Sequence, residues 1–351
     1  MLPDTAPVRP GEELDRARLA AYLEGKIDGA ADGIEIEQFP GGHSNLTYCL
    51  RTGGKEYVLR RAPLGPVAPK AHDMAREARI LEAVSPFFPQ APKPYLVCED
   101  PTILGAVFFL MERRRGIILR HGVPESVASQ PDYAPRISEA FMNCFAALHS
   151  IDVEKNGLLV LGKPEGFVER QVKGWSERWI RAKTEPMPEA DEVMSWLAAH
   201  IPPSGPPTLV HNDYKLDNVM LPLDSIDRVE AVLDWEMTTV GDPMIDVGLT
   251  LCYWTHATNP KVSGGGVPSF TSGPGWFTRD QFIAAYTEKT GRSVETLGYH
   301  EVLGVFKLAV ILQQIYYRFW KGQTSDERFR HFDQRVRALI EIAHGLVSKH
   351  A

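Results

Sequence analysis

The sequence predicts an α+β fold of two lobes, a small β-rich lobe over residues 1–112 and a larger, mainly helical lobe over residues 113–351. Strand-like runs bounded by glycine-containing turns fill the first third of the chain, and apolar residues recur at helical spacing in the remainder. A polar segment at residues 211–218 follows a short apolar run of the helical part. We therefore expect a small sheet and a helical body, each with a core of its own.

The first lobe is expected to contain five strands and two helices after a proline-containing tail at residues 1–10. The strand-like runs are bounded mostly by turn-forming residues and lie at 34–39, 46–51, 56–61, 95–98 and 106–111. Apolar residues at helical spacing predict one helix within residues 11–26 and another over residues 71–84. Gly53 and Gly54 predict a hairpin turn between the second and third strands.

Helices dominate the expected second lobe. The helical segments share apolar residues on one face and lie at 136–150, 167–183, 190–200 and 301–320. The last of them is apolar almost all round, so it should be buried. A short strand over residues 229–233 should lead to Asp234, and residues 256–275 form a Gly-, Ser- and Pro-rich loop long enough to be a lid or to be disordered.

Composition narrows the class of protein. With 351 residues, 44% of them hydrophobic and 24% charged, the chain is ordinary for a soluble globular protein, and its net charge of -7 argues against a nucleic-acid binder. The four cysteines form no CxxC pair, so structural zinc and disulfides are not expected and a reducing cytoplasm fits best. The N-terminus lacks the features of a signal peptide, and the longest apolar stretches are too short to span a membrane.

The clearest chemistry lies in Asp213, Asn218 and Asp234. Asp213 precedes Asn218 by five residues, and Asp234 follows after a short hairpin. Phosphoryl transfer needs a carboxylate that orients the attacking hydroxyl and oxygen ligands that hold magnesium against the phosphate. Asp213 fits the catalytic base, and Asn218 and Asp234 fit magnesium ligands. An ordinary polar turn is the alternative, but the apolar runs on both sides favour the chemical interpretation.

Four further residues surround these candidates in the sequence. Lys215 could neutralise charge on the transferring phosphate, although a solvated loop lysine is an equal alternative. His211 is better suited to packing and hydrogen bonding than to acting as the base. Asp242 is expected to cap a helix that begins at Pro243. Asp246 is expected to brace residues 211–218, here called the catalytic loop.

A phosphate-covering segment is expected in the first hairpin, at residues 39–48. Gly41 and Gly42 allow backbone N–H groups to approach an anion closely, Ser44 adds a hydroxyl, and Asn45 follows in the same segment. The segment does not match GxGxxG, so an ordinary glycine turn is the alternative.

Arg60, on the third strand, could grip two phosphate oxygens, with Glu77 of the following helix as its partner. The alternative is a strand arginine that faces solvent. Residues 108–113 would cross between the lobes, where Met111 and Arg113 could contact an adenine ring through backbone groups. A buried strand describes that segment equally well.

Together these segments resemble the motifs of the aminoglycoside phosphotransferase and choline kinase-like superfamily, which shares the protein-kinase fold. The segments that carry the resemblance lie at 41–48, 57–61, 147–152, 211–218 and 233–243. More narrowly, residues 19–344 resemble the kinase-like domain found fused to certain acyl-CoA dehydrogenases. The resemblance implies a nucleotide-binding first lobe, a catalytic second lobe, and ATP- and Mg²⁺-dependent transfer of phosphate to the hydroxyl of a small molecule.

The chain departs from the protein-kinase pattern, because Asp234-Trp235-Glu236 replaces Asp-Phe-Gly and the Ala-Pro-Glu signature is missing. A protein substrate is therefore not expected. The narrower resemblance suggests a hydroxyacyl-CoA acceptor, and the basic residues of 167–183 could meet its phosphates or simply be solvated. An aminoglycoside or an amino alcohol is the alternative substrate. The rival function is a catalytically silent nucleotide-binding or scaffold protein, which the replacement of the usual Lys by Arg60 keeps open.

Overall fold

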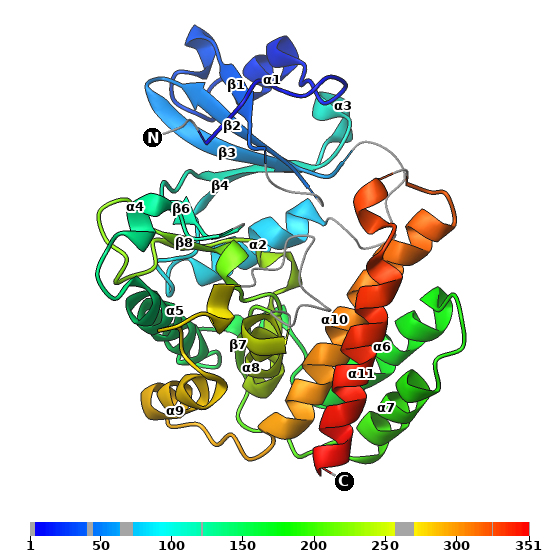
Figure 1. The fold of residues 1–351 in the computed structure, drawn as a ribbon. Helices are drawn as coiled ribbons and strands as arrows, with labels where there is room; N and C mark the ends of the chain where they lie inside the picture. Colours follow the sequence, from blue (N-terminus) through cyan, green and yellow to red (C-terminus); the bar gives the residue numbers. More distant parts are fainter. Residues whose placement is uncertain are drawn as a thin grey trace. The chain divides into compact units, whose positions relative to one another are not determined.

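The computed structural model describes residues 4–40, 45–63, 73–120, 122–256, 270–324 and 326–350. They form two compact units, residues 1–115 with 233–236, and residues 116–232 with 237–351 (Figure 1). The sequence placed a division after Glu112, three residues before the end of the first unit's main segment. The short segment Leu233–Glu236 belongs to the first unit although it lies far along the chain.

The first unit is built on a five-stranded antiparallel sheet with the strand order β1-β2-β3-β5-β4. Its strands are β1 (Glu35–Gln38), β2 (Leu46–Thr52), β3 (Lys55–Arg61), β4 (Pro94–Cys98) and β5 (Phe108–Glu112). All five predicted strands are therefore present. Gly53 and Gly54 both have positive φ angles, as a two-residue hairpin loop requires, and they join β2 to β3 in the predicted place.

Alternation along β3 divides the sheet's side chains between two faces. Leu59 packs with Leu19 and Leu23 of α1 (Arg16–Leu23), whereas Arg60 turns to α2 (Met74–Val84). Helix α2 lies within the predicted range 71–84 and begins after Asp73, whose side chain caps it. The short helix α3 (Pro101–Leu104) was not predicted.

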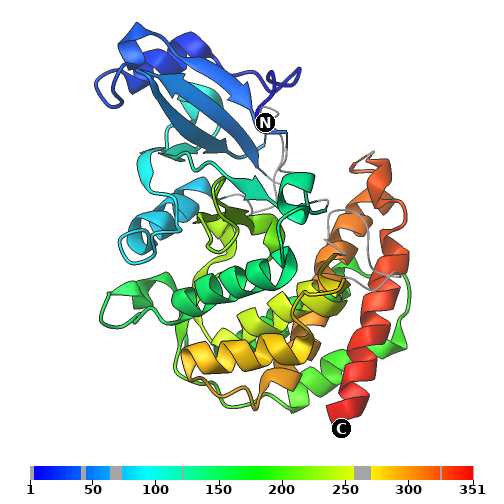
Figure 2. The same ribbon diagram turned by 60° about the vertical axis from the view of Figure 1, so that its left-hand side comes forward.

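The second unit is mainly helical, as predicted (Figures 1 and 2). Its helices are α4 (Glu125–Ala128), α5 (Tyr133–His149), α6 (Phe167–Ala182), α7 (Pro188–Ala199), α8 (Pro243–Leu251), α9 (Arg279–Thr290), α10 (Leu297–Trp320) and α11 (Phe332–His350). Four of them, α5, α6, α7 and α10, match the helical segments predicted from periodicity. Helices α9 and α11 were not predicted, although α9 packs on α5 and α11 packs along α10.

Short strands frame the loops of this unit. Strand β7 (Thr208–Val210) pairs with β10 (Thr239–Gly241), and β8 (Val219–Leu221) pairs with β6 (Ile117–Ile118) and β9 (Ala231–Val232). Residues 211–218 therefore connect β7 to β8, and each of these strands is paired with other strands. Such anchoring at both ends suits a loop that must hold its side chains in fixed positions.

Helix α10 is the centre of the helical core. Among the helices that the structure describes, it alone is long and apolar enough to cross a membrane, but 61% of its most apolar stretch is buried inside the protein. That burial agrees with the predicted core helix. Its backbone approaches α8 closely, because a Cβ atom on Gly248 would lie 2.3 Å from the carbonyl oxygen of His300, and one on Gly304 would lie 2.7 Å from that of Gly248.

Gly248→Ala is expected to lower the free energy of unfolding by roughly 1–3 kcal/mol, because the new methyl group must push two helix backbones apart. Chemical denaturation followed by circular dichroism measures the change. Gly174→Ala is the matched control, since Gly174 lies in α6 and a Cβ atom added there would meet nothing within 4 Å beyond its chain neighbours and the backbone of its own helix. The control should be stabilised by up to about 1 kcal/mol through helix propensity. Equal effects of the two substitutions would contradict the close α8–α10 contact.

Candidate active site

Asp213 lies at the centre of a hydrogen-bonded cluster in the second unit. Its Oδ2 atom accepts a hydrogen bond of 2.8 Å from Nδ2 of Asn218. The ammonium group of Lys215 lies 3.0 Å from Oδ1 and 2.9 Å from Oδ2. Three residues singled out from the sequence are thus brought together, and the carboxylate is fixed on both of its oxygens.

Tyr253 completes this cluster and was not found from the sequence. Its hydroxyl donates a hydrogen bond of 2.9 Å to Oδ1 of Asp213, and the ammonium group of Lys215 lies 4.9 Å from the centre of its ring. Burial raises the pKa of Tyr253 well above its ordinary value, so the hydroxyl remains a donor. Tyr253 lies in a single π-helical turn, Cys252–His256, a feature often found at functional sites.

Asp246 of α8 braces the catalytic loop, as predicted. Its carboxylate accepts hydrogen bonds from the backbone N–H groups of His211, at 2.5 Å, and Asn212, at 2.7 Å. His149 lies 3.3 Å from the same carboxylate. The predicted cap is also present, because the Asp242 side chain accepts from the N–H of Met244 at the start of α8.

The predicted Arg60–Glu77 ion pair is present in the first unit. Nη1 of Arg60 lies 2.7 Å from Oε1 of Glu77, and both side chains are buried. Nη2 of the same guanidinium lies 3.2 Å from Oδ1 of Asp234. Arg60 is therefore not a strand arginine that faces solvent. It joins the third strand, the following helix and the Asp234 turn.

The turn that carries Asp234 is held firmly against the first unit. Asn45 donates a hydrogen bond of 3.0 Å to the carboxylate of Glu236, and the Arg76 side chain donates to the Glu236 carbonyl oxygen. The Trp235 ring packs edge-on against Phe88 with a centroid distance of 5.8 Å. Asp234 itself has a φ angle of +67°, in a region that Asp tolerates better than most residues.

Among the described residues around Asp234, carboxylates outnumber guanidinium groups. The acidic members are Glu77, Asp234 and Glu236, and the basic members are Arg60 and Arg76. Burial raises the pKa of Glu77 to about 7, and the neighbouring carboxylates add to the shift. A cation bound at Asp234 would relieve this excess of negative charge.

The remaining nucleotide-site candidates are partly described. Gly41, Gly42 and Ser44 lie outside the described residues. Met111 is buried in β5, where it pairs with Val58 of β3. Its backbone is therefore a strand backbone, which is one of the two interpretations that the sequence left open.

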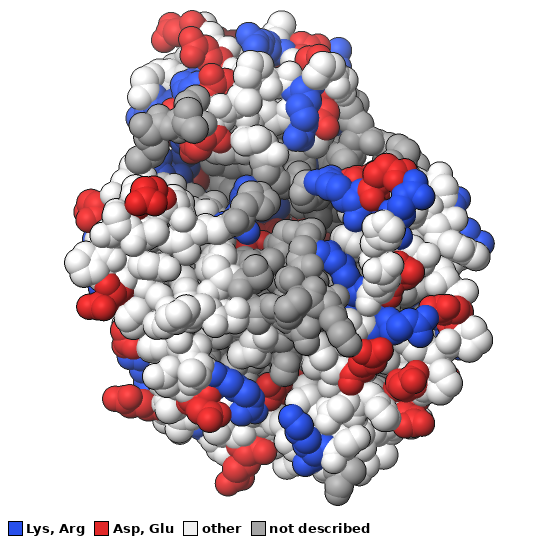
Figure 3. Space-filling view, viewed as in Figure 1, with Lys and Arg blue, Asp and Glu red and all other residues white. Residues whose placement is uncertain are grey.

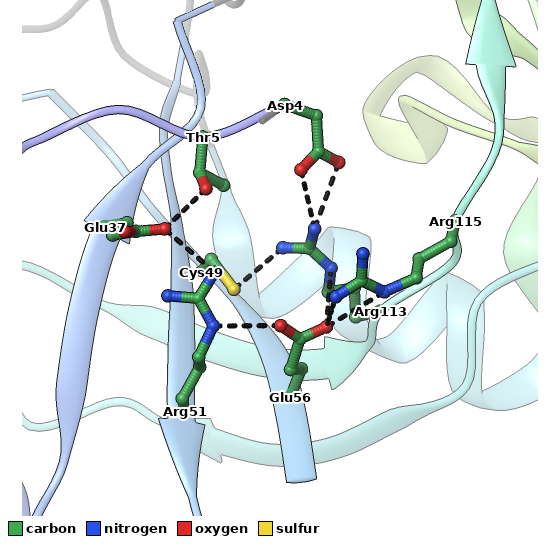
Figure 4. Close-up of polar contacts among 8 residues, drawn as sticks. All are labelled: Asp4, Thr5, Glu37, Cys49, Arg51, Glu56, Arg113 and Arg115. Atoms are coloured by element: carbon green, nitrogen blue, oxygen red, sulfur yellow. Dashed lines mark hydrogen bonds and ion pairs between the residues drawn. The ribbon is translucent and has the colours of Figure 1, made fainter. Parts of the chain in front are cut away.

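The Arg113 side chain is engaged within the first unit. It is 2% exposed, donates to both carboxylate oxygens of Asp4 and to Sγ of Cys49, and lies 3.1 Å from Glu56 (Figure 4). Glu56 also pairs with Arg51 and Arg115. Any contact of Arg113 with a nucleotide would consequently use its backbone, as the prediction stated.

Two further cations, Arg178 and Lys307, lie close to one ring of α6. The sequence pointed to the basic residues of 167–183 but not to Lys307. Arg178 of α6 stacks on the Trp175 ring, with 4.3 Å between guanidinium carbon and ring centre. Lys307 of α10 lies 5.4 Å from the same ring centre. Burial lowers the pKa of Arg178 and that of Lys307, and the charges of Arg178 and Lys215 lower the pKa of Lys307 further. Lys307 is thus within electrostatic reach of Arg178, Lys215 and Asp213.

Several other basic residues of the second unit are neutralised by neighbouring carboxylates. Figure 3 shows Lys and Arg side chains gathered over the upper ends of α10 and α11, with acidic side chains among them. Arg328 pairs with Asp326, and Arg330 pairs with Glu327, at exposed positions. Exposed pairs of this kind contribute little and leave little net charge for a ligand. On α6, Arg181 likewise pairs with Glu177.

Within the described ranges, no group of three or more His, Cys, Asp or Glu side chains is arranged to hold a metal ion. Magnesium does not require such a group, because it keeps several waters and binds phosphate oxygens with one or two protein ligands. An amide oxygen, such as that of Asn218, and a carboxylate, such as that of Asp234, are each hard oxygen donors of the kind that magnesium prefers. The donor chemistry of these residues therefore fits Mg²⁺.

Comparison with known proteins assigns the chain to a family. The sequence profile of the phosphotransferase enzyme family matches residues 35–277, so the chain belongs to this family. Acyl-CoA dehydrogenase family member 10 from Mus musculus is 31% identical over 351 residues, which cover 99% of this chain and 32% of that protein. The chain thus spans about a third of the length of this relative, and the narrower resemblance seen in the sequence is confirmed.

Solved structures confirm the kinase-like α+β fold. A protein of Ralstonia eutropha JMP134, provisionally described as an aminoglycoside phosphotransferase, matches with a TM-score of 0.81 and 30% identity, over 96% of this chain and 99% of its own. A thermostable mutant of an aminoglycoside phosphotransferase, in ternary complex with AMP-PNP and hygromycin B, matches with a TM-score of 0.60 and 15% identity, over 95% of this chain and 99% of its own. The second likeness concerns the fold alone.

Proposed function

We propose that the chain is a cytoplasmic, ATP- and Mg²⁺-dependent phosphotransferase that acts on a hydroxyl group of a small molecule. The observation that carries the proposal is the setting of Asp213, whose carboxylate is fixed by Asn218, Lys215 and Tyr253 within a loop that Asp246 braces. A positioned carboxylate of this kind can orient a hydroxyl and accept its proton. Membership of the phosphotransferase enzyme family supports the same chemistry.

Each residue has a definite part in the proposed reaction. The hydroxyl oxygen forms a bond to the γ-phosphorus while the bond to the ADP oxygen breaks, and the hydroxyl proton passes to Asp213. Lys215 stabilises the negative charge on the phosphoryl group. Arg60, oriented by Glu77, binds phosphate oxygens of ATP, and backbone groups of residues 108–113 contact the adenine. Asn218 and Asp234 would hold Mg²⁺, which supplies neutralisation of the phosphate charge.

Charge favours an anionic acceptor. Lys215 lies beside Asp213, the half-buried Arg178 lies on α6 of the same unit, and Arg178 makes no ion pair with any residue in the part of the chain that the structure describes. A cationic aminoglycoside would be repelled by this set. The phosphates of a hydroxyacyl-CoA suit it, and the relative named for acyl-CoA dehydrogenase supports that choice. We therefore propose a hydroxyacyl-CoA as the acceptor.

The acceptor is tested by measuring ATP consumption by the purified protein with hydroxyacyl-CoAs, amino alcohols, sugars and aminoglycosides. The highest kcat/KM is expected with a hydroxyacyl-CoA. Turnover confined to aminoglycosides or amino alcohols would contradict the anionic acceptor but not the phosphotransferase. Tight ATP binding without turnover of any acceptor would favour the rival, a catalytically silent nucleotide-binding protein.

Arg60→Lys is expected to keep part of the activity, and Arg60→Ala is expected to lose more. Lysine retains the charge but loses the two-pronged geometry, whereas alanine also leaves Glu77 buried without its partner. Steady-state kinetics with varied ATP measure both effects, and the KM for ATP should rise in the order wild type, Lys, Ala. Arg79→Ala is the control, because Arg79 lies on the same helix α2 and is exposed. Unchanged ATP kinetics of Arg60→Ala would show that Arg60 does not bind the nucleotide.

A further inference from the structure

Lys307 is a buried lysine in the middle of α10, with 2% of its surface exposed. A buried ammonium group is costly unless it is hydrogen-bonded or paired. Its Nζ atom lies 3.2 Å from the carbonyl oxygen of Asn212 and 3.3 Å from Oδ1 of the same residue. No carboxylate among the described residues lies within ion-pair distance of it. The contacts of this side chain therefore converge on one residue of the catalytic loop.

Each polar group of Asn212, in both the backbone and the side chain, makes a hydrogen bond. Its N–H donates to Asp246, and its Nδ2 donates to the carbonyl oxygen of Met237 at 3.1 Å. Its carbonyl oxygen and its Oδ1 both accept from Lys307. The φ angle of Asn212 is +64°, a left-handed conformation that persists where the surroundings enforce it. Because Asn212 directly precedes Asp213, this conformation sets the direction of the backbone at Asp213 and thereby the direction of the Asp213 side chain.

The close contact of α8 and α10 explains how two helices reach the same residue. Their backbones approach at Gly248 and Gly304, where a Cβ atom would clash. Asp246 lies two residues before Gly248, and Lys307 lies one turn after Gly304. The same helix crossing therefore delivers an acceptor to the N–H of Asn212 and a donor to its carbonyl oxygen.

We propose that Lys307 is a positioning residue for phosphoryl transfer, which holds Asn212 in its left-handed conformation and thereby orients the carboxylate of Asp213. The inference rests on the proposed function. Lys307 acts through Asn212 and not on the reacting atoms. Misplacement of a reacting group by about 1 Å can cost on the order of a hundredfold in rate, so a positioning effect is large enough to measure.

The charge of Lys307 should strengthen its hydrogen bonds to Asn212, because an ammonium group is a stronger donor than a neutral amine. Burial lowers the pKa of Lys307 to about 8. The charged groups that face it are Asp246 of α8 and Asp213 of the loop, which raise the pKa, and Arg178 of α6 and Lys215, which lower it. Above a pH of about 8 the contact with Asn212 should weaken, and kcat should fall.

The contribution of Lys307 to the free energy of unfolding should rise with pH, whereas kcat should fall. The pKa of Lys307 is depressed in the folded protein, so between about pH 8 and pH 10 the unfolded chain binds more protons at this residue than the folded protein does. Stability of the wild type relative to a variant without the amine therefore rises with pH across this window. If Lys307 had a purely structural role, kcat would not fall while the stability rises with pH.

The test compares wild type, Lys307→Met and the control Lys349→Met, whose lysine is exposed near the end of α11. At pH 7, Lys307→Met is expected to lower kcat roughly ten- to a hundredfold with KM values for ATP and acceptor within about twofold of wild type. The wild-type kcat should fall above a pH of about 8, and that fall should be absent from Lys307→Met. The Tm of wild type relative to Lys307→Met should rise between about pH 8 and pH 10.

A kcat for Lys307→Met within twofold of wild type, or the same alkaline fall in both proteins, would overturn the inference while the proposed function stands. If neither protein transfers phosphate although both bind ATP, the proposed function fails and the inference fails with it. Should Lys307→Met not fold, Lys307→Gln replaces it, since glutamine keeps a neutral donor. Its kcat should be reduced and should show no alkaline fall, and a wild-type pH profile would overturn the inference.

Discussion

Asp213→Asn is expected to lower kcat by roughly two to four orders of magnitude, the usual contribution of a positioned general base. The asparagine amide has nearly the same shape as the carboxylate but cannot accept the hydroxyl proton. Affinity for ATP should change little, because Asp213 is assigned to the acceptor and not to the nucleotide. Steady-state kinetics with an identified acceptor and calorimetric titration with ATP measure the two quantities.

The control for this prediction is Asp224→Asn, which removes an exposed carboxylate of the same unit. It should leave kcat unchanged. Asn218→Ala should behave differently from both, since it is expected to raise the Mg²⁺ requirement as well as to lower the rate. Near-normal turnover by Asp213→Asn would show that Asp213 is not the base.

Asp234→Ala is expected to abolish turnover while the fold remains intact. Its carboxylate would hold Mg²⁺ against the phosphates, and it also accepts from Arg60 at 3.2 Å. Asp234→Asn, which keeps one oxygen donor, should retain some activity at raised Mg²⁺ concentration. Turnover measured against Mg²⁺ concentration, with circular dichroism to check the fold, separates these outcomes. Full activity of Asp234→Ala with Mg²⁺ and ATP would remove Asp234 from the metal site.

Local patterns in the sequence were sufficient for much of the fold and part of the site. The five strands of the first unit follow from strand-like runs between turn-forming residues, and Gly53 and Gly54 predicted one hairpin. Asp213 and Asn218 lie within one short loop, so their roles could be assigned from the sequence, although the hydrogen bond between them could not. The Arg60–Glu77 pair could be predicted because a strand and the helix after it are neighbours in the chain.

Contacts that depend on tertiary packing could not be predicted in this way. Tyr253 is 40 residues from Asp213, and Lys307 is 95 residues from Asn212. Each lies in an apolar helical segment with no local feature that points to the loop. The partners of Arg113 are similarly remote, since Asp4 precedes it by 109 residues. Sequence periodicity identifies the buried face of a helix but not which distant residue that face meets.

The most direct test of the central claim is the transfer of radiolabel from [γ-³²P]ATP to a hydroxyacyl-CoA by wild type and Asp213→Asn in parallel. The account predicts Mg²⁺-dependent label on the hydroxyl of the acceptor with wild type, and almost none with Asp213→Asn, although both proteins bind ATP equally. Label in inorganic phosphate alone, or equal transfer by the two proteins, would contradict it.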